Sequence, residues 1–355
     1  MKKFKKLVSS LKYIIIYFII LLLIYFINIS NKISLISINN LKKNNSRIID
    51  IIKINIQNLI SKKFKKRITY INALYIKRRL RFGNFFISLN NAIIFCEFLG
   101  CKRIIIQHHF INHKIFYQKY NLTIESNFYI NNIDNDSLIV DIGFFYSSLN
   151  FSYLGKVNRF HVFRKSILNN LPKVKVNSDE LYIYIRGGDI FRCLNKTNKN
   201  YTQPPLCFYK KVLNQFIFKK YTIISEDILN PVIQILLKEF PYIKYNRNNI
   251  KLDISYLANS YNIISATSAF ILSIIKLNKN LKFLWEYDFY ILSERYKHLH
   301  YSVYTFSFNY TIYKMNVSEH YKKFMHPFTN SEKQRKIMIE EKCDKNFNLI
   351  TPRVS

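Results

Sequence analysis

One short segment of the chain combines residue types that can bind a phosphorylated ligand. The apolar run LYIYI, which begins at Leu181, is followed by Arg186, Gly187, Gly188 and Asp189. Such a run is typical of a buried strand, which would present Arg186 at its carboxyl end. A guanidinium can bind a diphosphate through paired hydrogen bonds. The two glycines permit a tight turn with exposed backbone, and Asp189 can accept hydrogen bonds from that turn. The spacing fits an ordinary turn with a surface arginine equally well.

Two later strand-like runs also end in polar side chains. The first run, YTII, is followed by Ser225, Glu226 and Asp227. The second run, NIIS, ends at Ser265, and Thr267 and Ser268 follow it closely. Hydroxyl groups and free backbone N–H groups at the start of a helix form a cradle for phosphate, although the same residues can serve only as helix caps. In one parallel sheet the three polar ends would meet at a single edge, where a ligand can bind.

The region between Leu181 and Leu284 alternates in a way that can position these ends. Strands are predicted at LYIYI, YTIIS, YIKYN, NIISA and LKFLW. Helices are predicted at PLCFYKKVLNQF, NPVIQILLKEF, LDISYLANS and SAFILSIIKL, with Asn230 and Pro231 as the N-cap and first position of the second helix. Strands separated by helical crossovers predict a Rossmann-like parallel sheet that is covered on both faces.

A similar unit precedes this region. The periodicity over 83–100 predicts a helix that ends at Gly100, and the run over 101–107 predicts a strand. Residues 108–178 are expected to complete a mixed α/β lobe. The predicted fold class is therefore α/β, with two Rossmann-like lobes and a ligand-binding cleft between them.

The N-terminal part of the chain predicts a membrane anchor. No charged side chain occurs from Tyr13 to Asn31, and a helix of this length spans about 28 Å, the thickness of a bilayer core. The lysines before it favour a cytoplasmic N-terminus. We expect a cytoplasmic tail over 1–12, a signal anchor over 13–31, a stem over 32–73, an N-terminal lobe over 74–178, a second lobe over 179–290, and a C-terminal extension over 291–355 that packs partly on the lobes. A cleaved signal peptide is the alternative.

This topology would place the lobes in the lumen of the secretory pathway, where glycosylation sequons and disulfides acquire meaning. Sequons begin at Asn121, Asn195, Asn200, Asn309 and Asn316. The five cysteines are odd in number, so at least one is expected to stay free or to pair between chains. Cys193 and Cys207 could close the loop after the Arg186 segment, and Cys96 is expected to be a buried thiol.

The formal net charge of +34 ordinarily suggests a polyanionic partner. The lysines and arginines are spread from Lys2 to Arg353 without an RNA-binding fingerprint, and the abundance of Lys, Asn, Ile, Phe and Tyr is typical of AT-rich codons. No nucleic-acid partner is therefore expected, while a basic membrane-tethering protein without enzymatic activity stays an alternative. His108, His109 and His113 lack carboxylates or cysteines at metal-binding spacing, so no metal is expected.

Four segments together resemble the fucosyltransferase superfamily, which includes α1,2-, α1,6- and protein O-fucosyltransferases. YIRGGD resembles the H-x-R-x-G-D donor motif of these enzymes, with Tyr184 in place of the histidine and Gly187 in place of the second arginine. IISED is similar to the second motif, and LDISYLANSYNIISATSAFILSIIKL to the third. RFGNFFISLNNAIIFCEFLG resembles the segment that opens these domains. The four segments occur in order between Arg81 and about Leu284.

The resemblance implies two GT-B-like lobes and the inverting, metal-independent transfer of a sugar, such as fucose from GDP-fucose, to a glycan or glycoprotein in the Golgi or ER. Arg186 would bind the β-phosphate and stabilise the leaving diphosphate. The other residues implied by position are Ser268 with the backbone of Ala269 and Phe270 for phosphate, Asp253 for the base or ribose, and Gly83 and Asn84 for the cleft. Glu226, Asp227 and Asp189 are candidates for the general base. A catalytically inactive, nucleotide-binding relative is an alternative that would not need Arg186.

Overall fold

The structure is a computed structural model that describes residues 73–77, 81–106, 108, 110–111, 114–126, 137–141, 159–195, 202–266, 268–288, 309–343 and 346–350. All of these residues belong to one compact unit, 64–355. The predicted cytoplasmic tail, the predicted anchor over 13–31 and nearly all of the predicted stem lie outside the described residues, as does Thr267. No helix in the ranges given above is long and apolar enough to cross a bilayer.

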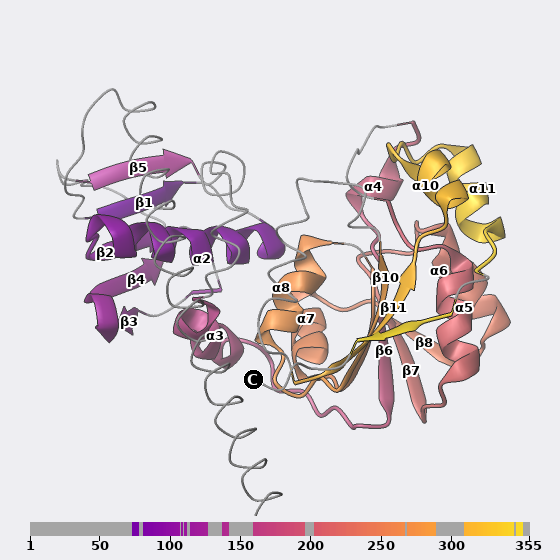
Figure 1. The fold of residues 1–355 in the computed structure, drawn as a ribbon. Coiled ribbons are helices and arrows are strands. Elements are labelled where there is room, and N and C mark those ends of the chain that lie inside the picture. Colours follow the sequence, from indigo (N-terminus) through magenta and orange to yellow (C-terminus); the bar gives the residue numbers. More distant parts are fainter. Residues whose placement is uncertain are drawn as a thin grey trace, which may run out of the picture. The chain divides into compact units, whose positions relative to one another are not determined.

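The first sheet has five strands in the order β3-β4-β2-β1-β5 (Figure 1). They are β1 (Ala73–Lys77), β2 (Arg103–Ile106), β3 (Ile115–Tyr117), β4 (Leu122–Ser126) and β5 (Ser137–Asp141). The β3–β4 pair is antiparallel and the other pairs are parallel. The helix α2 (Phe82–Leu99) connects β1 to β2, and Gly100 ends it with a φ of 70°, a conformation that favours glycine. The predicted helix over 83–100 and the strand over 101–107 are thus confirmed.

The second sheet has seven strands in the order β12-β11-β10-β9-β6-β7-β8. They are β6 (Glu180–Tyr184), β7 (Lys220–Ile224), β8 (Ile243–Asn246), β9 (Asn262–Ser265), β10 (Phe283–Asp288), β11 (Thr311–Asn316) and β12 (Asn348–Ile350). All neighbours are parallel except β11 and β12. The five strands predicted between 181 and 285 are confirmed, and their order is that of a Rossmann-like, doubly wound sheet.

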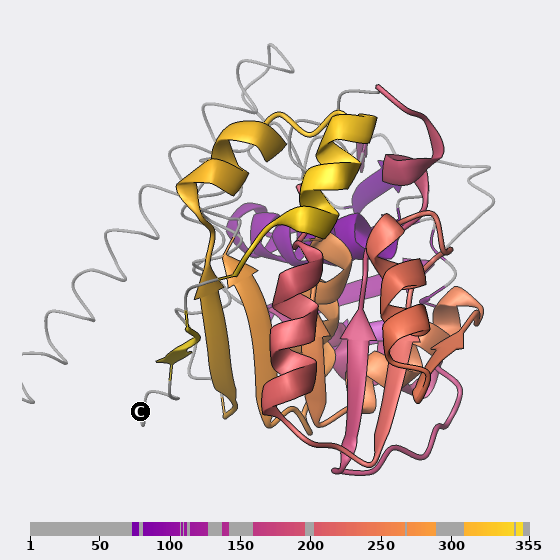
Figure 2. The same cartoon turned by 90° about the vertical axis from the view of Figure 1, so that its right-hand side faces the viewer.

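Helices cover both faces of this second sheet (Figures 1 and 2). On one face lie α7 (Ile250–Asn259) and α8 (Ala269–Leu277), and on the other lie α5 (Leu206–Gln215), α6 (Pro231–Glu239) and α11 (Glu332–Glu340). Two short helices, α4 (Asp189–Arg192) and α10 (Glu319–Met325), follow β6 and β11. The core between the sheet and the layer formed by α5, α6 and α11 is apolar, and Ile183, Phe208 and Leu236 are fully buried in it. The four helices predicted in this region are confirmed, and Asn230 accepts a hydrogen bond from Val232 N as an N-cap.

The C-terminal part of the chain belongs to the second sheet itself. The expected extension over 291–355 supplies the strands β11 and β12, which continue the sheet beyond β10. A disulfide between Cys207 and Cys343 joins this part to α5. The predicted pairing of Cys193 with Cys207 is therefore wrong, and Cys193 is a free, exposed thiol. The short sequence distance favoured Cys193 in the prediction, but the folded chain brings Cys343, which is 136 residues away from Cys207, next to α5. Cys96 is buried, as expected.

The N-termini of α2 and α8 approach each other closely. A Cβ atom added to Gly83 would lie 2.6 Å from both Ala269 C and Phe270 N, so only glycine permits this approach. Ser273 Oγ donates a 3.3 Å hydrogen bond to Gly83 O, and the Phe82 and Phe270 rings meet edge to face at 6.0 Å. The two lobes are also joined through α3 (Phe160–Asn169), whose Arg164 donates a 2.9 Å hydrogen bond to Leu277 O. The contact brings residues from both lobes to one place.

Candidate active site

Three polar strand ends lie side by side at the carboxyl edge of the second sheet. The strand β6, which leads to Arg186, pairs with β7 on one side and β9 on the other. Glu226 therefore follows the neighbouring strand on one side, and Ser268 follows the neighbouring strand on the other. The prediction that these ends share one edge is confirmed. Their proximity follows from the parallel order of the strands, because parallel neighbours place their carboxyl ends together.

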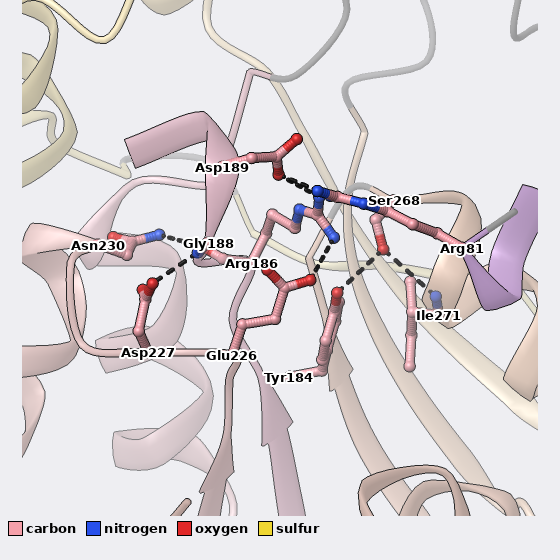
Figure 3. Close-up of polar contacts among 10 residues, drawn as sticks. All are labelled: Arg81, Tyr184, Arg186, Gly188, Asp189, Glu226, Asp227, Asn230, Ser268 and Ile271. Atoms are coloured by element: carbon pink, nitrogen blue, oxygen red, sulfur yellow. Dashed lines mark hydrogen bonds and ion pairs between the residues drawn. The ribbon is translucent and has the colours of Figure 1, made fainter. Parts of the chain in front are cut away.

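Arg186 is the buried centre of a chain of ion pairs (Figure 3). Its Nη1 lies 3.1 Å from Glu226 Oε1 and its Nη2 lies 2.7 Å from Asp189 Oδ1, while 8% of its side chain is exposed. Asp189 Oδ1 also lies 2.9 Å from Nη1 of Arg81, which precedes α2. The buried Nε of Arg186 has no hydrogen-bond partner among the described residues. A buried donor without a partner costs about 1 to 3 kcal/mol, which favours a ligand at this position.

The charges around Arg186 fix its protonation state. Burial lowers the pKa of Arg186, but Tyr184, Glu226 and Asp189 outweigh this effect and leave the pKa above its usual value. Burial raises the pKa of Asp189, whereas Arg81 and Arg186 lower it by more, so the net pKa is below its usual range. At neutral pH the site therefore holds a guanidinium paired with carboxylates. An incoming diphosphate could compete with those carboxylates for the same cation.

The turn after β6 depends on two glycines and on Asp227. Gly188 has a φ of 70°, and a Cβ there would lie 1.6 Å from Glu226 Oε2. A Cβ at Gly187 would meet Ser225 Oγ at 2.8 Å. Asp227 Oδ1 accepts hydrogen bonds from Gly188 N and Leu229 N, each of 3.1 Å. The expectation that Asp189 accepts hydrogen bonds from this turn is wrong, because Asp189 begins α4 without a capping bond and pairs with two arginines instead.

Two helix N-termini open onto the same space. At α8, Ser268 Oγ accepts a 3.3 Å hydrogen bond from Ile271 N and donates a 3.3 Å hydrogen bond to the Tyr184 hydroxyl. At α2, the N-cap residue Arg81 makes no side-chain cap, so this terminus keeps backbone N–H groups without a side-chain acceptor. Each terminus carries partial positive charge from the helix dipole. Together with Arg186, they favour an anionic ligand.

These groups line a pocket of about 450 Å³. A pocket of this volume is large enough for a nucleotide-sized ligand. The predicted residues that line it are Gly83, Asn84, Arg186, Glu226, Ser268, Ala269 and Phe270, and the lining residues that were not predicted as part of the site are Arg81, Phe82, His108, Phe110 and Ile250. Arg81 and Phe82 directly precede the predicted Gly83 and Asn84, and His108 follows the carboxyl end of β2. A search for polar residues after every predicted strand would have found His108.

The remaining predicted residues that the structure describes do not line the pocket. Tyr184 is buried behind Ser268, Gly187 and Gly188 shape the turn, and Asp189 pairs with Arg186 and Arg81. Ser225 is buried, and its Oγ has no hydrogen-bond partner in the described part of the chain. Asp227 holds the turn through Oδ1, so Glu226 is the only one of the three candidate bases that lines the pocket.

Asp253 lies in the first turn of α7 and is buried. Burial raises its pKa to about 6, while the neighbouring Asn248 amide opposes this rise. Its Oδ1 has no hydrogen-bond partner within the described ranges. With this pKa the carboxyl group keeps its proton up to about pH 6 and is mostly ionised at neutral pH, where it can accept a hydrogen bond from a ligand that reaches α7.

His108 is held rigidly in the wall of the pocket. Its ring stacks on Phe85 with centroids 3.7 Å apart, and its Nδ1 accepts a long hydrogen bond of 3.4 Å from Phe110 N. The other two histidines of the cluster, His109 and His113, lie outside the described residues. Across the described ranges, no three His, Cys, Asp or Glu side chains are grouped as metal ligands would be.

The chain matches no model of a known protein family, no curated protein and no solved structure.

Proposed function

We propose that this protein is a glycosyltransferase that uses a nucleotide diphosphate sugar, specifically a GDP-sugar such as GDP-fucose, and transfers the sugar to a glycan or glycoprotein acceptor with inversion. One observation carries the proposal: the buried Arg186 and the N-termini of α2 and α8 line one pocket at the carboxyl edge of a Rossmann-like sheet. All three features favour a diphosphate. The two α/β lobes that meet at this pocket fit a GT-B-like arrangement.

The charge that develops on the leaving diphosphate determines what the site must supply. As the glycosidic bond to the donor breaks, negative charge grows on the β-phosphate, and fixed positive groups lower the energy of that state. In this proposal Arg186 supplies a full charge, and the helix N-termini supply aligned N–H groups. Together these groups supply the positive charge that a divalent cation supplies in metal-dependent transferases, so the proposed reaction needs no metal ion.

The carboxylates of the site have different parts in the proposal. Glu226 lines the pocket and pairs with Arg186 through Oε1. When the diphosphate binds Arg186 in its place, the Glu226 carboxylate leaves this ion pair and can accept the proton of the acceptor hydroxyl. Asp189 instead stays with Arg81, and its lowered pKa makes it a weak base. Asp253 is proposed to accept a hydrogen bond from the base or ribose of the donor.

The proposed location is the Golgi or ER lumen, with the chain held by a signal anchor over 13–31 in type II topology. The disulfide between Cys207 and Cys343 supports an oxidising compartment. The sequon asparagines that the structure describes are all exposed, as glycosylation requires: Asn121, Asn195, Asn309 and Asn316. We propose that the mature chain is a membrane-bound glycoprotein.

The proposal can be tested with the full chain in detergent micelles and a panel of nucleotide sugars. Donor hydrolysis, sugar transfer and saturable binding of GDP and UDP would each be measured. Arg186→Lys keeps the charge but loses the planar pair of donors, and it is expected to reduce kcat about 100-fold to 1,000-fold.

The matched control is Arg103→Lys, which alters an ion pair with Glu125 in the first sheet and should leave turnover unchanged. The proposal fails if no nucleotide binds saturably, or if Arg186→Lys and Arg103→Lys turn over at the same rate. Binding without hydrolysis or transfer of any donor would instead support a nucleotide-binding protein that lacks catalysis.

A further inference from the structure

Four large aliphatic side chains stand exposed at the edge of the sheet that carries the pocket. The exposed fractions are 49% for Leu194, 44% for Ile228, 41% for Leu229 and 43% for Ile250. We call these four residues the apolar row. Single exposed aliphatic residues are ordinary on protein surfaces, so the grouping of the row, rather than any one member, needs a physical reason.

The topology brings the row together. Leu194 follows the short helix α4 that comes after β6, Ile228 and Leu229 follow β7, and Ile250 begins α7 after β8. The strands β6, β7 and β8 are consecutive parallel neighbours in the sheet, so the chain leaves all three at the same edge. Ile250 also lines the pocket. The row therefore reaches the proposed active site at Ile250.

Among the described residues of the same connections, the charges that are neither paired nor held in the turn are basic. Arg192 is exposed two residues before Leu194, and Arg247 is exposed three residues before Ile250. Glu226 is paired with Arg186, and Asp227 is held by backbone N–H groups. An edge that presents both exposed aliphatic side chains and exposed arginines has the composition of surfaces that lie on phospholipid, where apolar groups enter below the headgroups and arginines bind phosphate.

We propose that the apolar row lies on the surface of a phospholipid bilayer, with Arg192 and Arg247 at the level of the lipid phosphates. Four side chains are too few for a stable protein–protein interface. They are sufficient for a chain that the predicted anchor over 13–31 already holds near a membrane, because tethering raises the local concentration of the surface. If the proposed transferase activity holds, this orientation turns the pocket toward acceptors that are carried by lipids.

The contact can be measured on the full chain reconstituted in phosphatidylcholine vesicles, with and without phosphatidylserine. Ile228→Cys would be labelled with an environment-sensitive fluorophore, in a background where Cys193→Ser removes the exposed free thiol. The matched control is Ile217→Cys in the same background, since Ile217 is 95% exposed between α5 and β7, at the opposite edge of the sheet. The label at 228 is expected to shift to the blue and to be quenched by doxyl-labelled lipid, and the label at 217 is not.

Two variants of the labelled chain separate membrane contact from other causes of burial. Leu229→Glu is expected to abolish the lipid quenching at 228, and Arg247→Glu is expected to weaken it most in vesicles that contain phosphatidylserine. The proposal is overturned if the labels at 228 and 217 are quenched equally, or if the label at 228 leaves water without being quenched by lipid, which would show a protein partner. These measurements do not depend on enzyme turnover, so they test the membrane contact even if the transferase proposal fails.

Discussion

The contact between Gly83 and α8 gives the most direct test of how the pocket works. In Gly83→Ala the new Cβ would lie 2.6 Å from Phe270 N, whereas ordinary van der Waals contact begins at 3.4 Å. The two helix N-termini must therefore part by 0.8 Å, the difference between these distances. The obstacle is backbone, which cannot turn aside as a side chain can. We expect this overpacking to cost about 1 to 3 kcal/mol of stability.

The same displacement should weaken anion binding. If a ligand makes hydrogen bonds of about 2.9 Å to both N-termini, its hydrogen bonds to one of them would lengthen to about 3.7 Å, which is beyond the range of a hydrogen bond. A hydrogen bond to a charged group contributes about 1.5 to 3 kcal/mol, so the Kd for GDP is expected to rise between about tenfold and a hundredfold. Calorimetric titration of the full chain with GDP measures this change.

Gly100→Ala is the matched control for this experiment. Gly100 ends the same helix with a φ of 70°, and beyond its own chain neighbours no atom of the described residues lies within 4 Å of a Cβ added there. The substitution should cost about 1 kcal/mol through backbone strain alone and leave GDP affinity unchanged. If Gly83→Ala binds GDP as tightly as Gly100→Ala does, the two helix N-termini do not act on one ligand and the reasoning about the pocket is refuted.

Three further outcomes are expected. The folded chain holds a proton on Asp253 up to about pH 6, whereas an unfolded aspartate loses it near pH 3.9; stability should therefore fall by up to about 3 kcal/mol as pH rises through this window. In urea titrations at several pH values, Asp253→Asn should not show this fall in stability. If its pH profile is identical to that of the unsubstituted chain, Asp253 is not a buried group that ionises in this window. Cys343→Ser removes a disulfide between residues separated by 136 positions and should lower the free energy of unfolding in urea by about 4 kcal/mol. Cys193→Ser should leave it unchanged, and equal effects of the two substitutions would argue against the Cys207–Cys343 pair. Tyr184→Phe removes the hydroxyl that accepts from Ser268 Oγ and should cost about 1 kcal/mol in thermal unfolding, and no loss would show that this hydrogen bond adds nothing.

Local sequence was sufficient to predict most of the second sheet and the residues at the centre of the site. The strands and helices between 181 and 285 follow from periodicity and from the capping residues Asn230 and Pro231, because both signals depend only on nearby residues. The approach of Arg186 to Glu226 and Ser268 follows from the same signals, since parallel strands must end at a shared edge. The Gly187–Gly188 pair was also a correct local signal of a tight turn, in which Gly188 has a positive φ that favours glycine.

Contacts between distant segments were decided only by the tertiary structure. Asp189 pairs with Arg81 from the other lobe, Asp227 holds the turn that Asp189 was expected to hold, and Cys207 bonds Cys343 rather than Cys193. In each case the residue has several possible partners of the right chemistry along the chain. The choice among them depends on which segments the packed sheet and helices bring within a few ångströms, and that distance is not encoded in local spacing. The sequence determined the sheet edge at which a ligand would bind, and the meeting of α2 with α8 decided the shape and charge of the pocket.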